Sequence, residues 1–373
     1  MKKTILTKVA PLSMAAVAAM GFAASAQAIS FKVSGQVDRA IVGADNGDKT
    51  GVGFVDNTGS NTRVRFVGTQ TMANGWTVGV DNEDAFRRNR SSAWDIRHSG
   101  NGSQNVDIRQ AKIWVHGPFG KLSLGQGDGA ANATTEVDLS GTGYLGGGVG
   151  TTFYMGGVTI VNDNKQPVTQ VSHIYGHFDA LSRLNRLRYD SPNFGPFKIA
   201  VSADENQAFE GALDFASSGS WGKAAAQFGF TNTGNFKAGT NYYDNLASYA
   251  SNREHIFTAS ASYLANNGLN ITGSYSKVDY VDGNKPNPTN YFVGVGYRFS
   301  KNNFQVGYGE TKDLLAAGSK AAAYNVSYVY DWTKSIQAYA SYHLVDVKSL
   351  GDGVSVSAKN VNAIFMGMRV KFM

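Results

Sequence analysis

The sequence predicts an all-β protein, a transmembrane antiparallel β-barrel of about sixteen strands. Three observations support this prediction. Apolar and polar residues alternate with a period of two in many short segments. Short polar turns alternate with longer polar loops along the chain. Glycine and aromatic residues (44 Gly, 21 Phe, 18 Tyr, 5 Trp) are spread from end to end, as expected of a wall between lipid and water.

Residues 1–28 have the features of a secretory signal peptide. Three lysines precede an apolar stretch at 9–25, and Ala26-Gln27-Ala28 forms a small-residue cleavage site. We expect cleavage near Ala28, which leaves 29–373 as the barrel domain in the bacterial outer membrane, crossing it many times. No later apolar run is long enough to cross a bilayer as a helix.

No single alternating segment establishes a strand, but together these segments predict a wall built of successive strands. They lie at 31–41, 63–66, 76–81, 257–262, 291–297 and 366–372. Short turns are predicted at 72–75, 117–118, 217–220, 265–268, 300–302 and 331–334. Longer loops are predicted at 43–60, 84–104, 231–252 and 281–289. Roughly 345 residues in sixteen strands leave about 22 for each strand and its connection, enough to cross the membrane.

One segment, 127–181, breaks this rhythm. It has little strand pattern and many glycines, and a stretch of that length without regular structure is uncommon unless it is functional. In a barrel, such a segment fits inside the lumen.

Composition and motifs exclude several classes of function. Cysteine is absent, so no disulfide stabilises the fold. Three lysines of 1–28 account for half of the net charge of +6; the remaining +3 is scattered and gives no nucleic-acid surface. The glycines at 141–146 match G-x-G-x-x-G without a strand before them or a helix after them, so we expect no cofactor. His173 and His177, with Asp179 beyond, lack an evident third ligand, and we expect solvated histidines rather than a metal site.

Four fragments occur in order at barrel spacing. They are Asn-Thr-Arg-Val-Arg-Phe-Val-Gly at 61–68, the strand–turn–strand at 108–126, Glu-Val-Asp-Leu-Ser-Gly at 136–141, and the segment 188–195. With them the sequence resembles the general diffusion porins of Gram-negative outer membranes, over nearly all of the mature chain. The resemblance implies a homotrimer with one pore per subunit, in contact with outer-membrane lipid and lipopolysaccharide. It also implies a third outer loop, here 127–181, that narrows the pore for ions and small hydrophilic solutes.

The resemblance also implies which residues face each other in the pore. Basic wall residues would oppose acidic residues of the loop. The basic candidates are Arg63, Arg65, Arg109, Arg186 and Arg188, and the acidic candidates are Glu136 and Asp138. The free energy of placing an arginine in lipid supports a lumen-facing position for Arg63 and Arg65, because an arginine at mid-depth in lipid costs about 2–4 kcal/mol. We expect no catalytic and no metal-binding residue.

Some features depart from the family or stay open. Gln36 stands where the family's first strand carries a lysine, and the chain ends on Met373 after Phe372. Arg39 falls on the outer face, which a bulge or a subunit interface would resolve. The basic residues at 87, 88 and 90 are placed in an outer loop, where they contact lipopolysaccharide phosphates, a neighbouring subunit or only solvent.

Alternative functions are a substrate-specific porin, an outer-membrane barrel enzyme and a soluble secreted lectin or adhesin. No serine lies in a recognisable Ser/His/acid setting, so we expect a channel rather than an enzyme. The preference for anions or cations is open, because the arginines and the two loop acids act in opposite directions.

Overall fold

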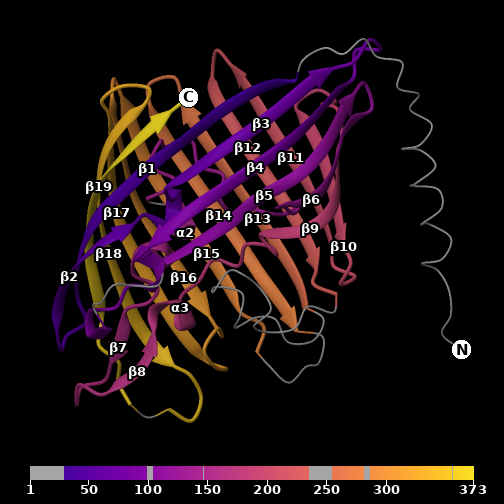
Figure 1. Ribbon diagram of the computed structural model, residues 1–373. Coiled ribbons are helices and arrows are strands. Elements are labelled where there is room, and N and C mark those ends of the chain that lie inside the picture. The colour runs from indigo at the N-terminus through magenta and orange to yellow at the C-terminus, as the bar shows by residue number, and fades with distance from the viewer. Residues whose placement is uncertain (1–28, 99–103, 146, 235–253, 281–285, 355) are drawn as a thin grey trace, which may run out of the picture.

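The computed structural model describes residues 29–98, 104–145, 147–234, 254–280, 286–354 and 356–373, so the predicted signal peptide lies outside the described residues. Antiparallel strands wind around a central lumen (Figure 1). They are β1 (Ser30–Asp45), β2 (Thr50–Asp56), β3 (Arg63–Thr71), β4 (Thr77–Arg88), β5 (Gln104–Gly117), β6 (Gly120–Asp128), β9 (Arg183–Asp190), β10 (Phe197–Asp204), β11 (Phe209–Gly219), β12 (Gly222–Asn232), β13 (Glu254–Ala265), β14 (Leu269–Tyr280), β15 (Thr289–Phe299), β16 (Asn302–Lys312), β17 (Ser319–Asp331), β18 (Ile336–Leu350) and β19 (Val361–Phe372).

The first and last strands close the barrel, since β1 pairs antiparallel with β19 from Gly35↔Phe372 to Asp45↔Asn362. The sheet contains 17 strands. Because β2 and β3 both pair with β1, one after the other, they fill a single position of the wall. The barrel therefore has sixteen positions, and the predicted fold class is confirmed.

The outward face of the wall is apolar. On β15, Val293 and Val295 are 50% and 46% exposed, whereas Asn290 of the same strand is 1% exposed and faces inward. Tyr291 and Tyr297 lie at the two ends of this apolar stretch. Polar residues inside and valines outside, flanked by aromatic residues, are the pattern of a strand that faces lipid.

Between β2 and β3 the chain leaves the wall and turns into the lumen as a short 3-10 helix, Thr58–Ser60. The side-chain amide of Gln36 holds this segment by donating hydrogen bonds to the carbonyl oxygens of Ser60 (2.7 Å) and Asn61 (2.9 Å). The residue that departs from the family's lysine thus binds the in-turned backbone.

The prediction of a long loop at 43–60 is wrong. β1 continues to Asp45, four residues turn, and β2 occupies most of the remainder. Packing explains two glycines of β2: a Cβ added to Gly53 would lie 2.3 Å from the Trp94 ring, and one added to Gly51 would lie 3.0 Å from Ile96. Glycine in a strand interior commonly marks such a close approach.

Other predicted boundaries shift by a few residues. β4 extends to Arg88 into the predicted loop 84–104, and β11 extends to Gly219 into the predicted turn 217–220. Much of the predicted loops 231–252 and 281–289 lies outside the described residues.

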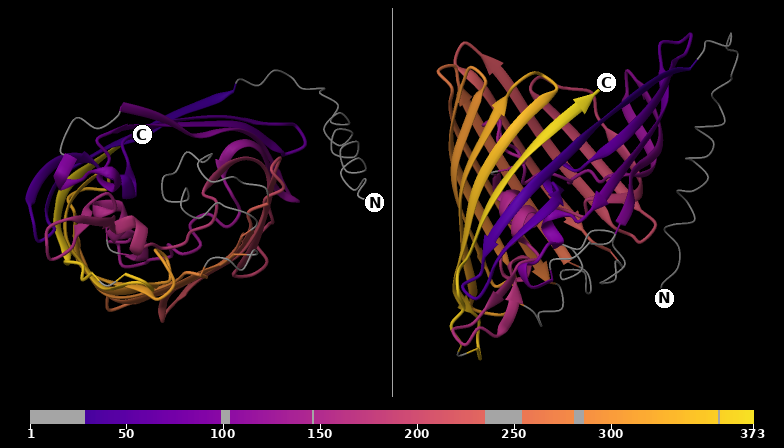
Figure 2. Two further views of the ribbon diagram at one scale, coloured as in Figure 1. Left: turned by 90° about the horizontal axis from the view of Figure 1, so that it is seen from below. Right: turned by 60° about the vertical axis from the view of Figure 1, so that its left-hand side comes forward.

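Residues 129–182, between β6 and β9, lie largely inside the barrel (Figure 2, left). They contain α2 (Gly147–Met155), the hairpin of β7 (Thr159–Val161) and β8 (Pro167–Gln170), and α3 (Val171–Ile174). None of the helices in the described part of the chain is both long and apolar enough to span a membrane.

Candidate functional site

The segment 129–182, which we call the inner loop, is fastened to the wall by hydrogen bonds. Its backbone N–H groups donate to inward-facing serine hydroxyls on three strands. The pairs are Ala130 to Ser202 (2.8 Å), Val137 to Ser260 (3.1 Å), Leu139 to Ser262 (3.0 Å) and Phe178 to Ser276 (3.1 Å). A loop inside a barrel needs partners for its backbone polar groups. The small polar residues that alternate along β10, β13 and β14 supply them.

The helix α2 packs against β18 and β19 through apolar contacts. The Tyr154 ring is fully buried, with its centroid 4.3 Å from that of Phe365 and 5.2 Å from that of His343. Leu145 and Met155 are buried in the same cluster. This cluster fills one side of the lumen and fixes the inner loop there.

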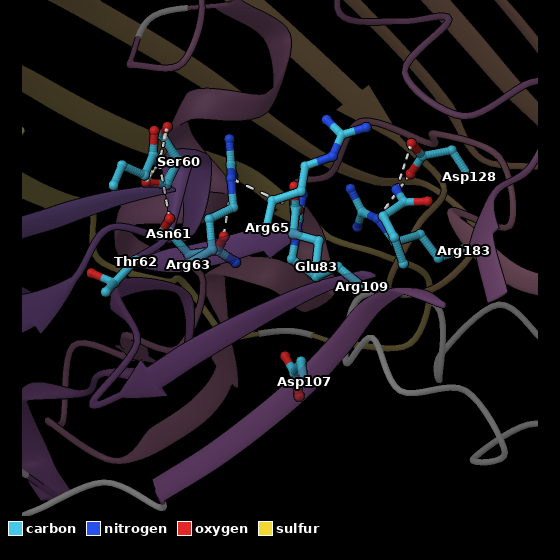
Figure 3. Close-up of polar contacts among 12 residues, drawn as sticks. Ser60, Asn61, Thr62, Arg63, Arg65, Glu83, Asp107, Arg109, Asp128 and Arg183 are labelled. Atoms are coloured by element: carbon cyan, nitrogen blue, oxygen red, sulfur yellow. Dashed lines mark hydrogen bonds and ion pairs between the residues drawn. The ribbon is translucent and has the colours of Figure 1, made fainter. Parts of the chain in front are cut away.

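Arginines gather on the stretch of wall that runs from β3 to β9. We call this surface, with Arg63, Arg65, Arg109 and Arg183, the arginine wall (Figure 3). Arg63 Nε lies 3.7 Å from Glu83 Oε1, and Arg109 contacts the same carboxylate oxygen. Arg65 forms a two-point pair with Asp81, with distances of 2.8 and 2.7 Å.

A β-bulge orients Arg109. Glu83 pairs with Gln110 and the next residue, Asp84, pairs with Ile108, so Arg109 is an extra residue in β5. Ile108 is exposed on the outer face, whereas Gln110 is buried on the inner one. Bulges commonly re-aim a side chain next to a functional site, and here the bulge lets Arg109 reach Glu83 inside the lumen.

Arg186 and Arg188 contact the base of the inner loop. Arg186 donates to the carbonyl oxygens of Asp128 (2.9 Å) and Gly125 (3.1 Å). Arg188 binds the Asp190 carboxylate (2.8 Å) and donates to the Gly129 carbonyl oxygen (2.7 Å). Both side chains hold the backbone where the chain leaves β6.

The two predicted acidic residues have different surroundings. Glu136 is partly exposed and lines a cavity of about 180 Å³ together with Arg109 and Arg183. Asp138 faces the wall instead: its carboxylate accepts hydrogen bonds from the Gln305 side chain (2.8 Å) and the Ser140 backbone N–H (2.6 Å). The structure therefore brings Glu136, but not Asp138, toward the arginine wall.

The surroundings of the inner loop shift the pKa values of two of its carboxyl groups and of one histidine. Enclosure within the barrel, and then repulsion from Asp179, raises the pKa of Glu136. Burial likewise raises the pKa of Asp179. Burial lowers the pKa of His177 to about 4, so this imidazole is neutral at neutral pH. Within the described residues, no group of three or more His, Cys, Asp or Glu side chains could hold a metal ion.

Some site residues were not predicted from the sequence. Arg183, whose Nε lies 2.8 Å from Asp128 Oδ1, stands at the first residue of β9, where alternation does not yet apply. The wall acids Asp81 and Glu83 were not named as site residues, although they alternate with outward residues on β4 and Asp81 ends the predicted strand 76–81. Arg87, predicted in an outer loop, is inward and 5% exposed, paired with Asp107 at 2.6 Å.

Arg39 does lie on the outer face. Its pairing with Asp56 continues without a bulge to the end of β1. The guanidinium Nη1 is 3.6 Å from the buried Asp56 carboxylate and 3.2 Å from the Arg88 carbonyl oxygen. The bulge that we considered for this position is absent from the β1–β2 pairing.

Comparisons with known proteins agree on the fold. A sequence model of the family described as Gram-negative porin matches residues 13–350. Three solved structures share the architecture at low identity: the anion-selective porin from Comamonas acidovorans (TM-score 0.64, 16% identity, 92% of this chain and 100% of that chain); a loop L8 deletion mutant of OmpT from Vibrio cholerae (0.59, 15%, 93% and 100%); and the outer membrane channel DcaP of Acinetobacter baumannii (0.59, 13%, 94% and 99%). No curated protein matches the sequence.

Proposed function

The chain belongs to the Gram-negative porin family and is an outer-membrane channel, and we propose that its pore prefers anions weakly among ions and small hydrophilic solutes. We further propose that the pore is narrowest between the inner loop and the arginine wall. Rings of charged side chains are a recognised selectivity device in pores.

One observation carries the proposed preference: Arg63 and Arg109 share the single carboxylate of Glu83. With Arg65 and Arg183, the arginine wall brings four guanidinium groups together around the carboxylates of Asp81, Glu83 and Asp128, an excess of positive charge. Glu136 and Asp179 on the loop side reduce this excess only where they are ionised, and their raised pKa values weaken that opposition near neutral pH. Charge of this kind acts strongly in a narrow pore with a protein lining.

Planar-bilayer recording tests both parts of the proposal. The purified protein should give stepwise openings whose conductance rises linearly with KCl concentration. In a KCl gradient, the reversal potential should take the sign of anion preference. Absence of openings from well-folded protein would reject the channel, and a reversal potential of cation sign would reject the preference alone.

We also propose that the barrel assembles as a homotrimer. Arg39 is 44% exposed on the outer face, next to the exposed apolar side chains of Ile41 and Phe54. An arginine facing lipid at mid-depth would cost about 2–4 kcal/mol. A neighbouring subunit over this part of β1 and β2 removes that cost, while the remaining outer face contacts lipid and lipopolysaccharide.

The proposed maturation is cleavage after Ala28, by the signal-peptide pattern of the sequence. Intact-mass measurement on protein from an outer-membrane fraction tests it. The mass should correspond to a chain that begins at Ile29; a mass that retains residues 1–28 would reject the proposal.

A further inference from the structure

A second charged cavity lies next to the arginine wall, toward the short turns, since Asp81 pairs with Arg65 of that wall and with Lys112 of the cavity lining. Its volume is about 490 Å³, and β5, β6, β9 and β10 surround it. Five cationic side chains line it: Lys112, Lys121, Arg186, Arg188 and Lys198. Only two carboxylates, those of Asp128 and Asp190, share the lining. We call this cavity the turn-side basin.

The cations of the turn-side basin are incompletely neutralised. The Asp190 carboxylate is shared by two of them, because Arg188 and Lys198 form ion pairs with its Oδ1 at 2.8 and 3.0 Å. In the described part of the chain, Lys121 and Arg186 have no carboxylate within ion-pair distance. Lys121 lies over the Trp114 ring, 4.6 Å from its centroid. Positive charge is therefore left available to a solute.

The walls of the turn-side basin offer neutral partners as well. Ser123 and Asn193 line it beside the cations, and His116 adds an imidazole. Hydrogen bonds between a cationic donor and an oxyanion are about twice as strong as those between neutral groups. A solute with several negative oxygens can contact more than one of these cations at once.

We propose that the turn-side basin binds small multivalent oxyanions, such as organic acids with two or three carboxylates or compounds with linked phosphates. The inference rests on the proposed pore, which brings the solute to the site. Monovalent anions of the same size gain one contact with a cation and are held weakly. Such a site makes passage of multivalent anions saturable, beyond simple diffusion.

Single-channel recording tests the proposal with three probes. Citrate and pyrophosphate are multivalent, and they separate carboxylate from phosphate chemistry. Gluconate resembles citrate in size but carries one charge. In a background of 0.1 M KCl, citrate or pyrophosphate added to one compartment should interrupt the current with a half-blocking concentration, and gluconate should not. Block should weaken at 1 M KCl, where the Debye length falls from about 10 Å to about 3 Å.

Two variants and a matched control locate the block. Lys121→Gln and Lys198→Gln should each raise the half-blocking concentration about tenfold, the change expected when one charge-assisted hydrogen bond is lost. Lys223→Gln removes the same charge from the turn end of β12, outside the basin, and should leave the block unchanged.

The outcomes separate the two proposals. If the wild-type protein conducts but neither multivalent probe blocks it, the proposed binding site is rejected and the proposed pore is retained. Equal block by gluconate, or an equal effect of Lys223→Gln, also overturns it. Folded protein that does not conduct rejects the proposed pore instead.

Discussion

Arg63 Nε lies 3.7 Å from Glu83 Oε1, and that oxygen is also the one that Arg109 contacts. The three side chains come from neighbouring strands β3, β4 and β5, so the rigid wall fixes their spacing. Glu83 is 9% exposed at its side chain, and Arg63 is 28% exposed. The lumen therefore meets the guanidinium groups more than the carboxylate between them.

Arg109→Glu should shift the reversal potential toward cations, because it replaces a positive charge with a negative one beside Glu83. Glu83→Gln should shift it in the opposite direction, since it leaves both guanidinium groups without their carboxylate. The measurement is the reversal potential in a KCl gradient, with Lys277→Gln on the outer end of β14 as a control. An unchanged potential in Arg109→Glu would remove Arg109 from the narrow part of the pore.

Anion preference should increase on acidification from pH 8 to pH 5. The pKa values of Glu136 and Asp179 are raised, so these carboxyls become neutral as the pH falls through this range. His177 adds no charge there, because burial lowers its pKa to about 4. The reversal potential measured at each pH reports the change.

A pair of variants assigns this pH dependence. Glu136→Gln should flatten the pH profile and raise the anion preference at pH 8. His116→Gln controls for the imidazole in the turn-side basin and should leave the profile in place. A Glu136→Gln profile as steep as that of the wild type would contradict the assignment.

Tyr154→Ala should release the inner loop from the wall. The substitution removes the ring contacts with Phe365 and His343. Truncation of a large aromatic side chain in a core lowers the free energy of unfolding by about 3–5 kcal/mol. The barrel strands keep their own pairing, so we expect folded protein with altered conductance and more current noise. Tyr342→Ala removes an exposed tyrosine of the same strand as His343 and should leave the conductance steady; noise in both variants would argue against the contact.

Arg39→Ala should weaken the trimer. It leaves the buried Asp56 carboxylate without its nearest cation at the outer face, a loss of about 1–3 kcal/mol per subunit. Electrophoresis of unheated samples at rising temperature measures the midpoint of dissociation. Lys277→Ala removes an outward lysine paired with Asp279 on the far side of the barrel, and an equal drop in that variant would rule out a specific role for Arg39.

The sequence predicted those features that depend on the alternation of residues along a strand. Arg63 and Arg65 could be placed in the lumen because Val64 and Phe66 occupy the other face of β3. Alternation does not predict the direction of a side chain where the strand itself is irregular. It could not show that the bulge at Arg109 lets that side chain reach Glu83; only the resemblance to a family suggested that role.

The inner loop could be recognised but not oriented. Glu136 and Asp138 look equivalent in a glycine-rich stretch, and what separates them is the wall opposite: Gln305 of β16 binds Asp138. The prediction of a loop at 43–60 failed for the same reason, since Gly51 and Gly53 of β2 pack against Ile96 and Trp94, which lie some forty residues away. Contacts between distant segments are absent from any local pattern.

The segment turned inward between β2 and β3 lies where β1 changes its pairing partner from β3 to β2. Gln36 pairs with Arg63 and Arg39 pairs with Asp56, so two residues of β1 stand opposite the six residues 57–62. The six residues leave the wall, and β3 resumes with Arg63 and Arg65 toward water. A shift of one residue in the pairing of β3 with β1 would turn both arginines toward the lipid, because side chains alternate between the two faces of a strand. The pore lining at β3 is thus set by the register with β1 and not by the length of the segment that turns inward.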